Sequence, residues 1–278
     1  MSNIERFTEH LRTSGVSGVS ESTILAYASD VRAFEEFSAH KGALVDESTV
    51  VSFLKECGDN GNSRETIRRK ISALRRFFSW FDLRGHPNPM RNICSPRRQA
   101  PKPRSTSIET VGKILLAMSG TTLSGLRDRA MVCLAAVDGL SSREVTQLDR
   151  ENVDDAGEVV FVKGRHSRSV VLGAWTKKAM SEYLDFAAEL FGPGPNDPLF
   201  LNKHKRRISD RSFRRRLSLA VSRCELDPSI NCRALRNTCA FGIVNRNGYS
   251  ALKRKFGYMS KGSANMYRPT VPQCKEAQ

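Results

Sequence analysis

The sequence has no long apolar run, no paired-cysteine motif and few acidic residues for its many basic ones. No stretch of the 278 residues approaches the roughly 18 apolar residues that a membrane-spanning helix needs, and residues 1–15 lack the apolar core of a secretion signal. The seven cysteines form no Cys-x-x-Cys pair, which predicts reduced thiols rather than disulfides or a metal site. We therefore expect a cytoplasmic protein that is neither exported nor inserted in a membrane.

The shortage of acidic residues points to a polyanionic partner. The chain has 29 Asp and Glu against 45 Lys and Arg, a net charge of +16. An excess of this size favours nucleic acid over an anionic membrane surface, which is the weaker alternative. We therefore expect duplex DNA as the partner, no membrane partner and a nucleoid-associated location. The excess is +3 over residues 1–100 and +13 over residues 101–278. The second part is therefore expected to make most of the phosphate contacts.

Proline and hydrophobic spacing divide the chain into two domains. Apolar residues recur at spacings of three and four over 22–38, 49–57 and 63–80, which predicts amphipathic helices. Five prolines and several basic residues then fall between residues 85 and 107, a density that excludes both helix and central strand. We expect a helical domain over 1–90, an extended basic linker over 91–106 and a second domain over 107–278.

The second domain is predicted to be mixed. Two β-branched runs, 158–162 and 168–172, flank KGRHS and indicate one β-hairpin. The expected fold class is thus mainly α with a small β-hairpin or sheet. Helical patterns are found at 107–119, 125–137, 143–148, 175–191, 209–224, 233–244 and 250–256.

Several motifs follow one another along the chain in a characteristic order. The second domain contains LRDRAMVCLAAVDGLSSREVTQL, VKGRHSRSVVL, RALRNTCA, KFGYMS and SANMYR, and the first contains TILAYASDVRAF and SRETIRRKISALRRFFSWF. Together they resemble the tyrosine recombinases, the phage-integrase-like and Xer-like enzymes. The resemblance spans nearly the whole chain and implies a helical core-binding domain followed by a mixed α+β catalytic domain.

The resemblance also implies a reaction, DNA recombination or integration such as mobile elements use. A tyrosine hydroxyl attacks a DNA phosphodiester and forms a 3′-phosphotyrosine link, with no metal or nucleotide cofactor. Negative charge grows on the non-bridging oxygens, so cationic donors are needed around the phosphate. Matched by motif, Tyr267 is the nucleophile, Arg236 the second phosphate-clamping arginine and Lys163 the general acid on the hairpin.

Three positions depart from the family pattern. Arg233 stands in place of the histidine of His-x-x-Arg, and Tyr258 in place of the late histidine or tryptophan; both keep hydrogen-bond donors and stay in the expected catalytic set. Ser141 stands where the family has its first arginine and cannot replace a bidentate guanidinium. Arg143 and Arg233 are the alternative sources of the missing charge.

The absence of this arginine leaves two functions open. Removing one preorganised donor slows a reaction on the order of 10²- to 10³-fold, which predicts a recombinase with impaired cleavage. The alternative is a duplex-DNA-binding relative that no longer cuts, and a topoisomerase-like relaxase is a distant third. Only RPTVPQCKEAQ follows Tyr267, which argues against a stable cyclic assembly and leaves a homo- or hetero-oligomer on DNA open.

Two arginine-rich segments are the expected duplex contacts. The predicted helix 63–80 carries five arginines against one acidic residue, and 203–216 carries eight basic residues against one aspartate. The expected DNA-binding residues are Arg68, Arg69, Arg75, Arg76, Lys205, Arg206, Arg207, Arg214 and Arg215.

Overall fold

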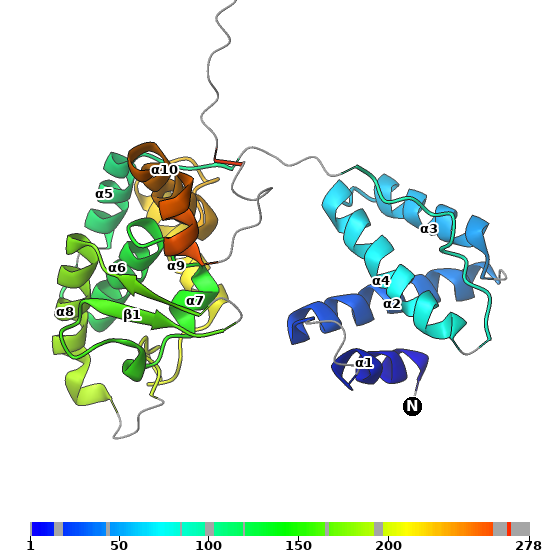
Figure 1. Cartoon of the computed structure of the whole chain (residues 1–278), viewed down its shortest axis with the longest axis horizontal. Coiled ribbons are helices and arrows are strands. Elements are labelled where there is room, and N and C mark those ends of the chain that lie inside the picture. Colours follow the sequence, from blue (N-terminus) through cyan, green and yellow to red (C-terminus); the bar gives the residue numbers. More distant parts are fainter. Residues whose placement is uncertain are drawn as a thin grey trace, which may run out of the picture. The chain divides into compact units, whose positions relative to one another are not determined.

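The chain forms two compact units, residues 1–99 and 100–278, in a computed structural model (Figure 1). Each unit is described by itself. The residues described are 2–13, 19–42, 45–83, 85–97, 103–118, 120–164, 167–191, 197–257 and 266–267.

The described part of the first unit is a bundle of four helices. They are α1 (Asn3–Thr13), α2 (Glu21–Lys41), α3 (Glu47–Asp59) and α4 (Arg64–Asp82), and α2 packs against the other three. Ser63 caps α4 by accepting the backbone N–H of Thr66. In the core, the Phe34 ring stands edge-on to Phe53 and Phe78 at 5.3 and 5.7 Å.

The sequence analysis assigned no element to the residues that form α1. Ile4, Phe7 and Leu11 are nevertheless buried at helical spacing, and the Phe7 ring contacts Phe77 edge-on at 5.3 Å. The signal was present but short, because a two-to-three-turn helix has little stability except through such packing.

Part of the segment expected as linker lies against the first unit. Ile93 is buried, and its carbonyl accepts a 2.6 Å hydrogen bond from the Arg75 guanidinium on α4. Arg68 donates in the same way to the carbonyl of Pro96. Two arginines of α4 thus hold the chain that leaves this unit.

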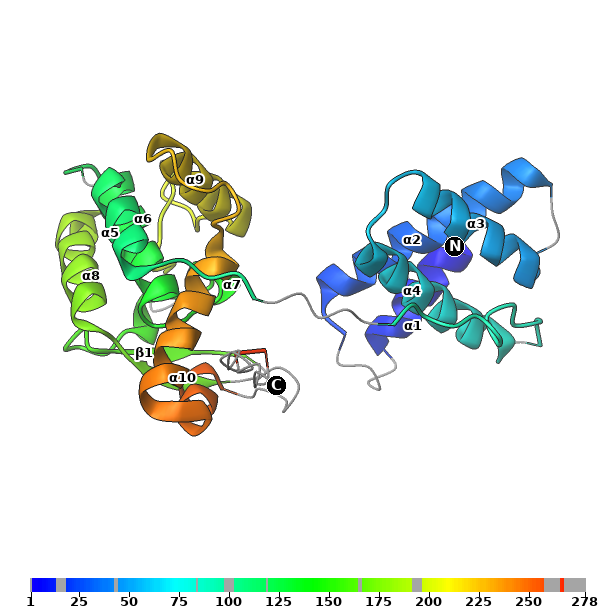
Figure 2. The ribbon, with the colours of Figure 1, turned by 90° about the horizontal axis from the view of Figure 1, so that it is seen from above.

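The second unit is built around one buried helix. Figure 2 shows α6 between α8 and α10, and α9 contacts it as well. Nine of the ten α6 positions from 127 to 136 are buried, so this helix is enclosed on nearly all sides. The elements are α5 (Ile108–Ala117), α6 (Leu123–Ala136), α7 (Ser142–Thr146), 3₁₀ helix η1 (Arg150–Asn152), β1 (Val159–Val162), β2 (Arg168–Val171), α8 (Ala174–Ala187), η2 (Ala188–Leu190), α9 (Asp210–Arg223) and α10 (Cys232–Phe256).

The expected hairpin is present as a two-stranded antiparallel sheet. Val159 pairs with Val171 and Val162 pairs with Arg168. The inward positions of β2 are Arg168 and Val170, so the strand alternation places a charged side chain inside the unit. The mainly helical fold with one small hairpin is confirmed. Within the described part of the chain, no helix combines the length and the apolar character needed to cross a membrane.

The last helix is broken within its length. Gly248 has φ 73° and ψ −178°, so α10 consists of two helical pieces that meet at this residue, where the sequence analysis expected two separate helices. Phe256 at the end of the second piece lies against Gly139, in the turn before α7. A Cβ atom at Gly139 would stand 2.5 Å from the Phe256 ring, so this close approach requires glycine.

This contact gives a prediction for stability. Gly139 and Gly157 both have left-handed φ, +74° and +65°, but no atom lies within 4 Å of a Cβ built at Gly157. Gly157→Ala is expected to lower the free energy of unfolding by about 1–2 kcal/mol, the cost of the backbone conformation alone. Gly139→Ala should lower it by about 1–3 kcal/mol more, because Phe256 must also move. Urea unfolding measures both, and equal losses would contradict the contact.

Candidate active site

The turn before α7 places Ser141 and Glu144 in a reciprocal capping pair. The Ser141 hydroxyl accepts the Glu144 backbone N–H at 3.2 Å, and the Glu144 carboxylate accepts the Ser141 N–H at 2.7 Å. Ser141, which stands at the position of an expected arginine, therefore starts a helix. The pair turns the Glu144 side chain back toward the start of α7.

Glu144 binds two arginines from different elements. Its Oε1 lies 2.6 Å from Arg168 of β2, and its Oε2 lies 2.6 Å from Arg236 of α10. Burial alone would raise the pKa of Glu144, but the Arg168 hydrogen bond and the charge of Arg236, together with the Ser141 N–H, lower it to about 2. The carboxylate is therefore ionised, and the three side chains carry one net positive charge.

Arg236 is held from two sides. Opposite Glu144, its guanidinium lies over the Phe256 ring, 4.5 Å from the centroid. Burial lowers the pKa of Arg236, whereas the Glu144 charge raises it. About a quarter of the side chain, 23%, stays exposed, so an anion can still reach it.

Tyr267 lies beside this cluster with its hydroxyl covered. The residue is 5% exposed, its hydroxyl donates to Asn237 Oδ1 at 2.8 Å, and its ring stands edge-on to Phe241 at 5.2 Å. Burial raises the pKa of Tyr267, and the positive charges of Arg236 and Arg233 act in the opposite direction. The two arginines are thus near enough to influence the tyrosine, but the hydroxyl is protonated at neutral pH.

The other expected catalytic residues are placed differently. Lys163 follows β1, is exposed, and ion-pairs with Glu151 of η1; none of its described contacts reaches the Glu144 cluster. Arg233 is exposed on α10, one turn before Arg236, and Arg143 is exposed on α7. Tyr258 lies outside the described residues.

Three residues of this site were missed by the sequence analysis. Glu144 had a readable signal, the Ser-x-x-Glu spacing of a capping box. Arg168 had a weaker one, because a charged residue at an inward strand position implies a buried partner. Asn237 had none, since its partners are distant in sequence.

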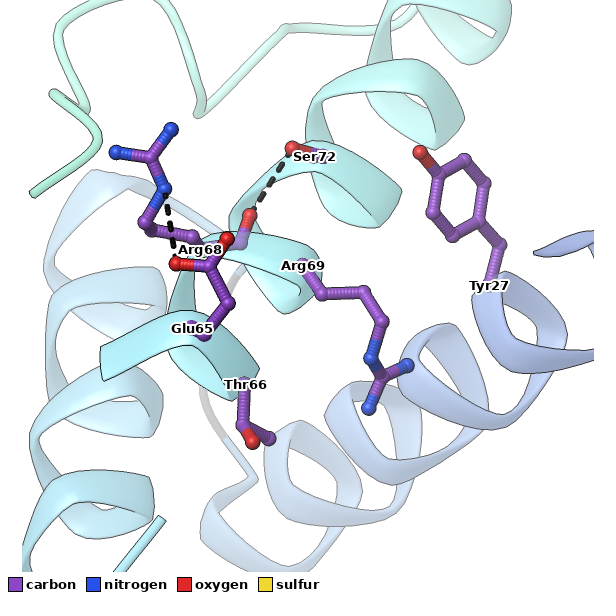
Figure 3. Close-up of a pocket in the computed structure, with 6 residues that line it drawn as sticks. All are labelled: Tyr27, Glu65, Thr66, Arg68, Arg69 and Ser72. Atoms are coloured by element: carbon purple, nitrogen blue, oxygen red, sulfur yellow. Dashed lines mark hydrogen bonds and ion pairs between the residues drawn. The ribbon is translucent and has the colours of Figure 1, made fainter. Parts of the chain in front are cut away.

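The arginines of α4 border an open pocket of about 470 Å³ between α2 and α4 (Figure 3). Arg69 extends from α4 over α2, where it ion-pairs with buried Asp30, and Tyr27 faces the same space. Arg68 points the other way and lies 3.7 Å from Glu65.

Several of the predicted DNA contacts have partners inside the protein. Arg207 donates to the carbonyls of Thr146 and Leu148 at 3.1 and 3.0 Å and ion-pairs with Asp149. Arg214 pairs with Asp210 at 2.8 Å, and Arg75 is bound to Ile93 as described above. Exposed side chains with no such partner among the described residues are Arg76, Lys205, Arg206 and Arg215.

A helical bundle, followed by a helix-rich unit with one hairpin in which a tyrosine lies beside an arginine cluster, is the architecture of the tyrosine recombinases. The chain belongs to the phage integrase family: the family's "Phage integrase, N-terminal SAM-like domain" matches residues 4–85, and "Phage integrase family" matches residues 108–272. The first unit is thus the core-binding domain and the second the catalytic domain.

Characterised relatives are similar over nearly the full chain. Tyrosine recombinase XerC of Oceanobacillus iheyensis is 27% identical over 276 residues, which cover 95% of this chain and 90% of the relative. Tyrosine recombinase XerD of Listeria monocytogenes serotype 4b is 28% identical over 262 residues, with 90% and 88% covered.

Solved structures share the fold. XerH site-specific recombinase bound to difH, in a pre-cleavage complex, matches with a TM-score of 0.74 at 21% identity and covers 98% of this chain and 82% of its own. The Tn1549 transposon integrase in complex with transposon right end DNA matches with a TM-score of 0.76 at 15% identity, covering 98% and 96%.

The two ion pairs of Glu144 predict a pH-dependent stability. The folded-state pKa is about 2 against an ordinary 4.5, so the stabilisation is present above pH 4.5 and lost as the pH falls toward 2. Between pH 6 and pH 2.5 the unmodified protein should lose about 3 kcal/mol more unfolding free energy than Glu144→Gln, measured by urea unfolding. Glu158→Gln, which changes a carboxylate that is 55% exposed, is the control. Parallel pH curves for Glu144→Gln and the unmodified protein would contradict the buried ion pairs.

Proposed function

We propose that this protein is a site-specific DNA recombinase that joins duplex DNA to Tyr267, with strand cleavage slowed by Ser141. The observation that supports this function best is the position of Arg236, held between Glu144 and the Phe256 ring and within electrostatic range of Tyr267. A lambda integrase dimer is bound to a COC′ core site in one related structure, and a tetramer to a Holliday junction in another. We extend this to action as an oligomer on DNA.

The proposed reaction conserves the phosphodiester. The Tyr267 oxygen bonds to phosphorus and loses its proton to water, while the bond from phosphorus to the 5′ oxygen breaks and that oxygen leaves as a 5′-hydroxyl after taking a proton. Lys163 supplies this proton once it has left Glu151. Arg236 and Arg233 stabilise the charge that develops on the non-bridging oxygens.

The expected slow cleavage follows from Ser141 and not from the Glu144 cluster. A carboxylate beside Arg236 would cancel most of its charge, and Arg168 restores the balance by binding the other oxygen of Glu144. Arg168 is only 6% exposed in its side chain, so it serves Arg236 rather than the phosphate. With Ser141 as a neutral helix cap, one side of the phosphate lacks a cation.

Restoring that cation is the direct test. Ser141→Arg is expected to raise the yield of covalent adduct on a nicked suicide substrate by about 10²-fold or more, and Tyr267→Phe should abolish the adduct in either background. Because Ser141→Arg also removes a helix cap, which costs about 1 kcal/mol, Ser141→Ala is the matched control and should give no gain. Rapid cleavage by the unmodified protein would contradict the proposal that Ser141 slows cleavage.

One observation favours a second function, duplex-DNA binding without cleavage. The Tyr267 hydroxyl is covered and donates to Asn237 Oδ1, away from solvent. If this second function holds, neither the unmodified protein nor Ser141→Arg forms an adduct, although both bind the same DNA.

DNA binding itself is expected to depend steeply on salt. Of the predicted DNA contacts in the 203–216 segment, Lys205, Arg206 and Arg215 are exposed and have no described internal partner. Changing all three to Gln should flatten the slope of log K against log salt by about 2.7, measured by fluorescence anisotropy on duplex DNA. Arg207→Gln should mainly lower the free energy of unfolding, because it leaves Asp149 and two carbonyls without their donor. An unchanged slope in the triple variant would show that this segment does not contact DNA.

A further inference from the structure

One amide side chain connects the chain entering the second unit with the candidate nucleophile. Asn237 follows Arg236 on α10 and is 4% exposed. Its Nδ2 donates to the carbonyl of Arg104 at 2.7 Å, and its Oδ1 accepts from the Tyr267 hydroxyl at 2.8 Å. Both polar ends of the side chain are used, one on each partner.

The next residue of α10 binds the same entering segment. The Thr238 hydroxyl donates to the carbonyl of Thr106 and accepts its N–H, both at 3.0 Å. Residues 104–106 therefore lie along α10 through three hydrogen bonds, of which Thr238 makes two and Asn237 one.

We propose that Asn237 is a positioning residue that couples residues 104–106 to the Tyr267 hydroxyl. While this segment lies on α10, the amide holds the tyrosine in its covered position, and displacement of the segment releases the hydroxyl. The inference rests on the proposed function, because that function makes Tyr267 the nucleophile.

The coupling follows from burial. When the Arg104 carbonyl moves away, Asn237 keeps a buried N–H donor without a partner, which is unfavourable, so the amide turns to find another acceptor. Its Oδ1 turns with it and leaves the Tyr267 hydroxyl. The two hydrogen bonds therefore form and break together.

Arg104 supplies a trigger for the displacement. Its backbone carbonyl accepts a hydrogen bond from Asn237, whereas its side chain is exposed. Two hydrogen bonds from Ser229 lower the pKa of Asp227 more than the positive charge of Arg104 does. A DNA phosphate that captures this guanidinium pulls on the residue that holds Asn237 in place. Substrate binding then uncovers the nucleophile.

The test measures both ends of the coupling in the full-length protein. Tryptic cleavage after Arg104 reports release of the segment, and nitration of Tyr267 by tetranitromethane, quantified by mass spectrometry, reports exposure of the hydroxyl. Thr238→Val is the decisive variant, because Thr238 binds the segment and makes no described contact with Tyr267. It should accelerate both reactions about 10-fold or more, because both hydrogen bonds between the Thr238 hydroxyl and Thr106 are lost, and Thr238→Ser should leave both rates unchanged.

Nitration of buried Tyr183, whose hydroxyl bonds to the backbone of Leu199 and Leu201, is the control for unfolding. Faster cleavage after Arg104 with unchanged Tyr267 nitration would overturn the proposal. If Thr238→Val also exposes Tyr183, Tyr267→Phe decides instead, because it removes only the hydroxyl that donates to Asn237: faster cleavage after Arg104 supports the coupling, and an unchanged rate overturns it. Neither readout requires DNA cleavage, so a failed adduct assay would overturn the proposed function without deciding this coupling.

Discussion

The catalytic domain depends on one ionised carboxylate. Glu144 binds the backbone at Ser141, the hairpin through Arg168 and α10 through Arg236, so three separate parts of the chain meet at its two oxygens. A buried charge with good partners contributes little net stability, but losing one partner leaves the others uncompensated. The same contacts fix the guanidinium of Arg236 beside Tyr267, so the geometry of the site and the integrity of the fold depend on the same interactions.

Some arginines of this protein bind other parts of the chain, and others remain available to phosphate. Composition alone does not distinguish these two groups. Arg75 and Arg207 are used to bind backbone carbonyls, and Arg69 neutralises a buried aspartate. Planar guanidinium groups suit such multiple contacts better than lysine does. The excess of positive charge still indicates a polyanion, but the number of cations available to phosphate is smaller than the sequence suggests.

Local pattern predicted the elements well and the site only in part. Apolar spacing gave α2, α4, α6 and the hairpin, because each buries a face that repeats with the period of its backbone. Tyr267, Arg236 and Arg233 came from motifs, and the two arginines lie within electrostatic range of the tyrosine, with Arg233 exposed on α10. Glu144, Arg168 and Asn237 did not emerge, since a hydrogen bond between residues 24 or 92 positions apart leaves no periodic trace. Lys163 was expected near the phosphate, and its pairing with Glu151 is equally invisible in sequence.

Helix α7 has only five residues, too few to be stable alone. The Ser141 and Glu144 pair caps its first turn. Arg207, from residues 203–216, donates hydrogen bonds to the carbonyls of Thr146, its last residue, and of Leu148 just beyond it. Because a helix this short depends on the contacts at both of its ends, we expect residues 203–216, α7 and the Glu144 cluster to open as one cooperative unit. Native-state hydrogen exchange would then give the amides of these regions a shared free energy of opening.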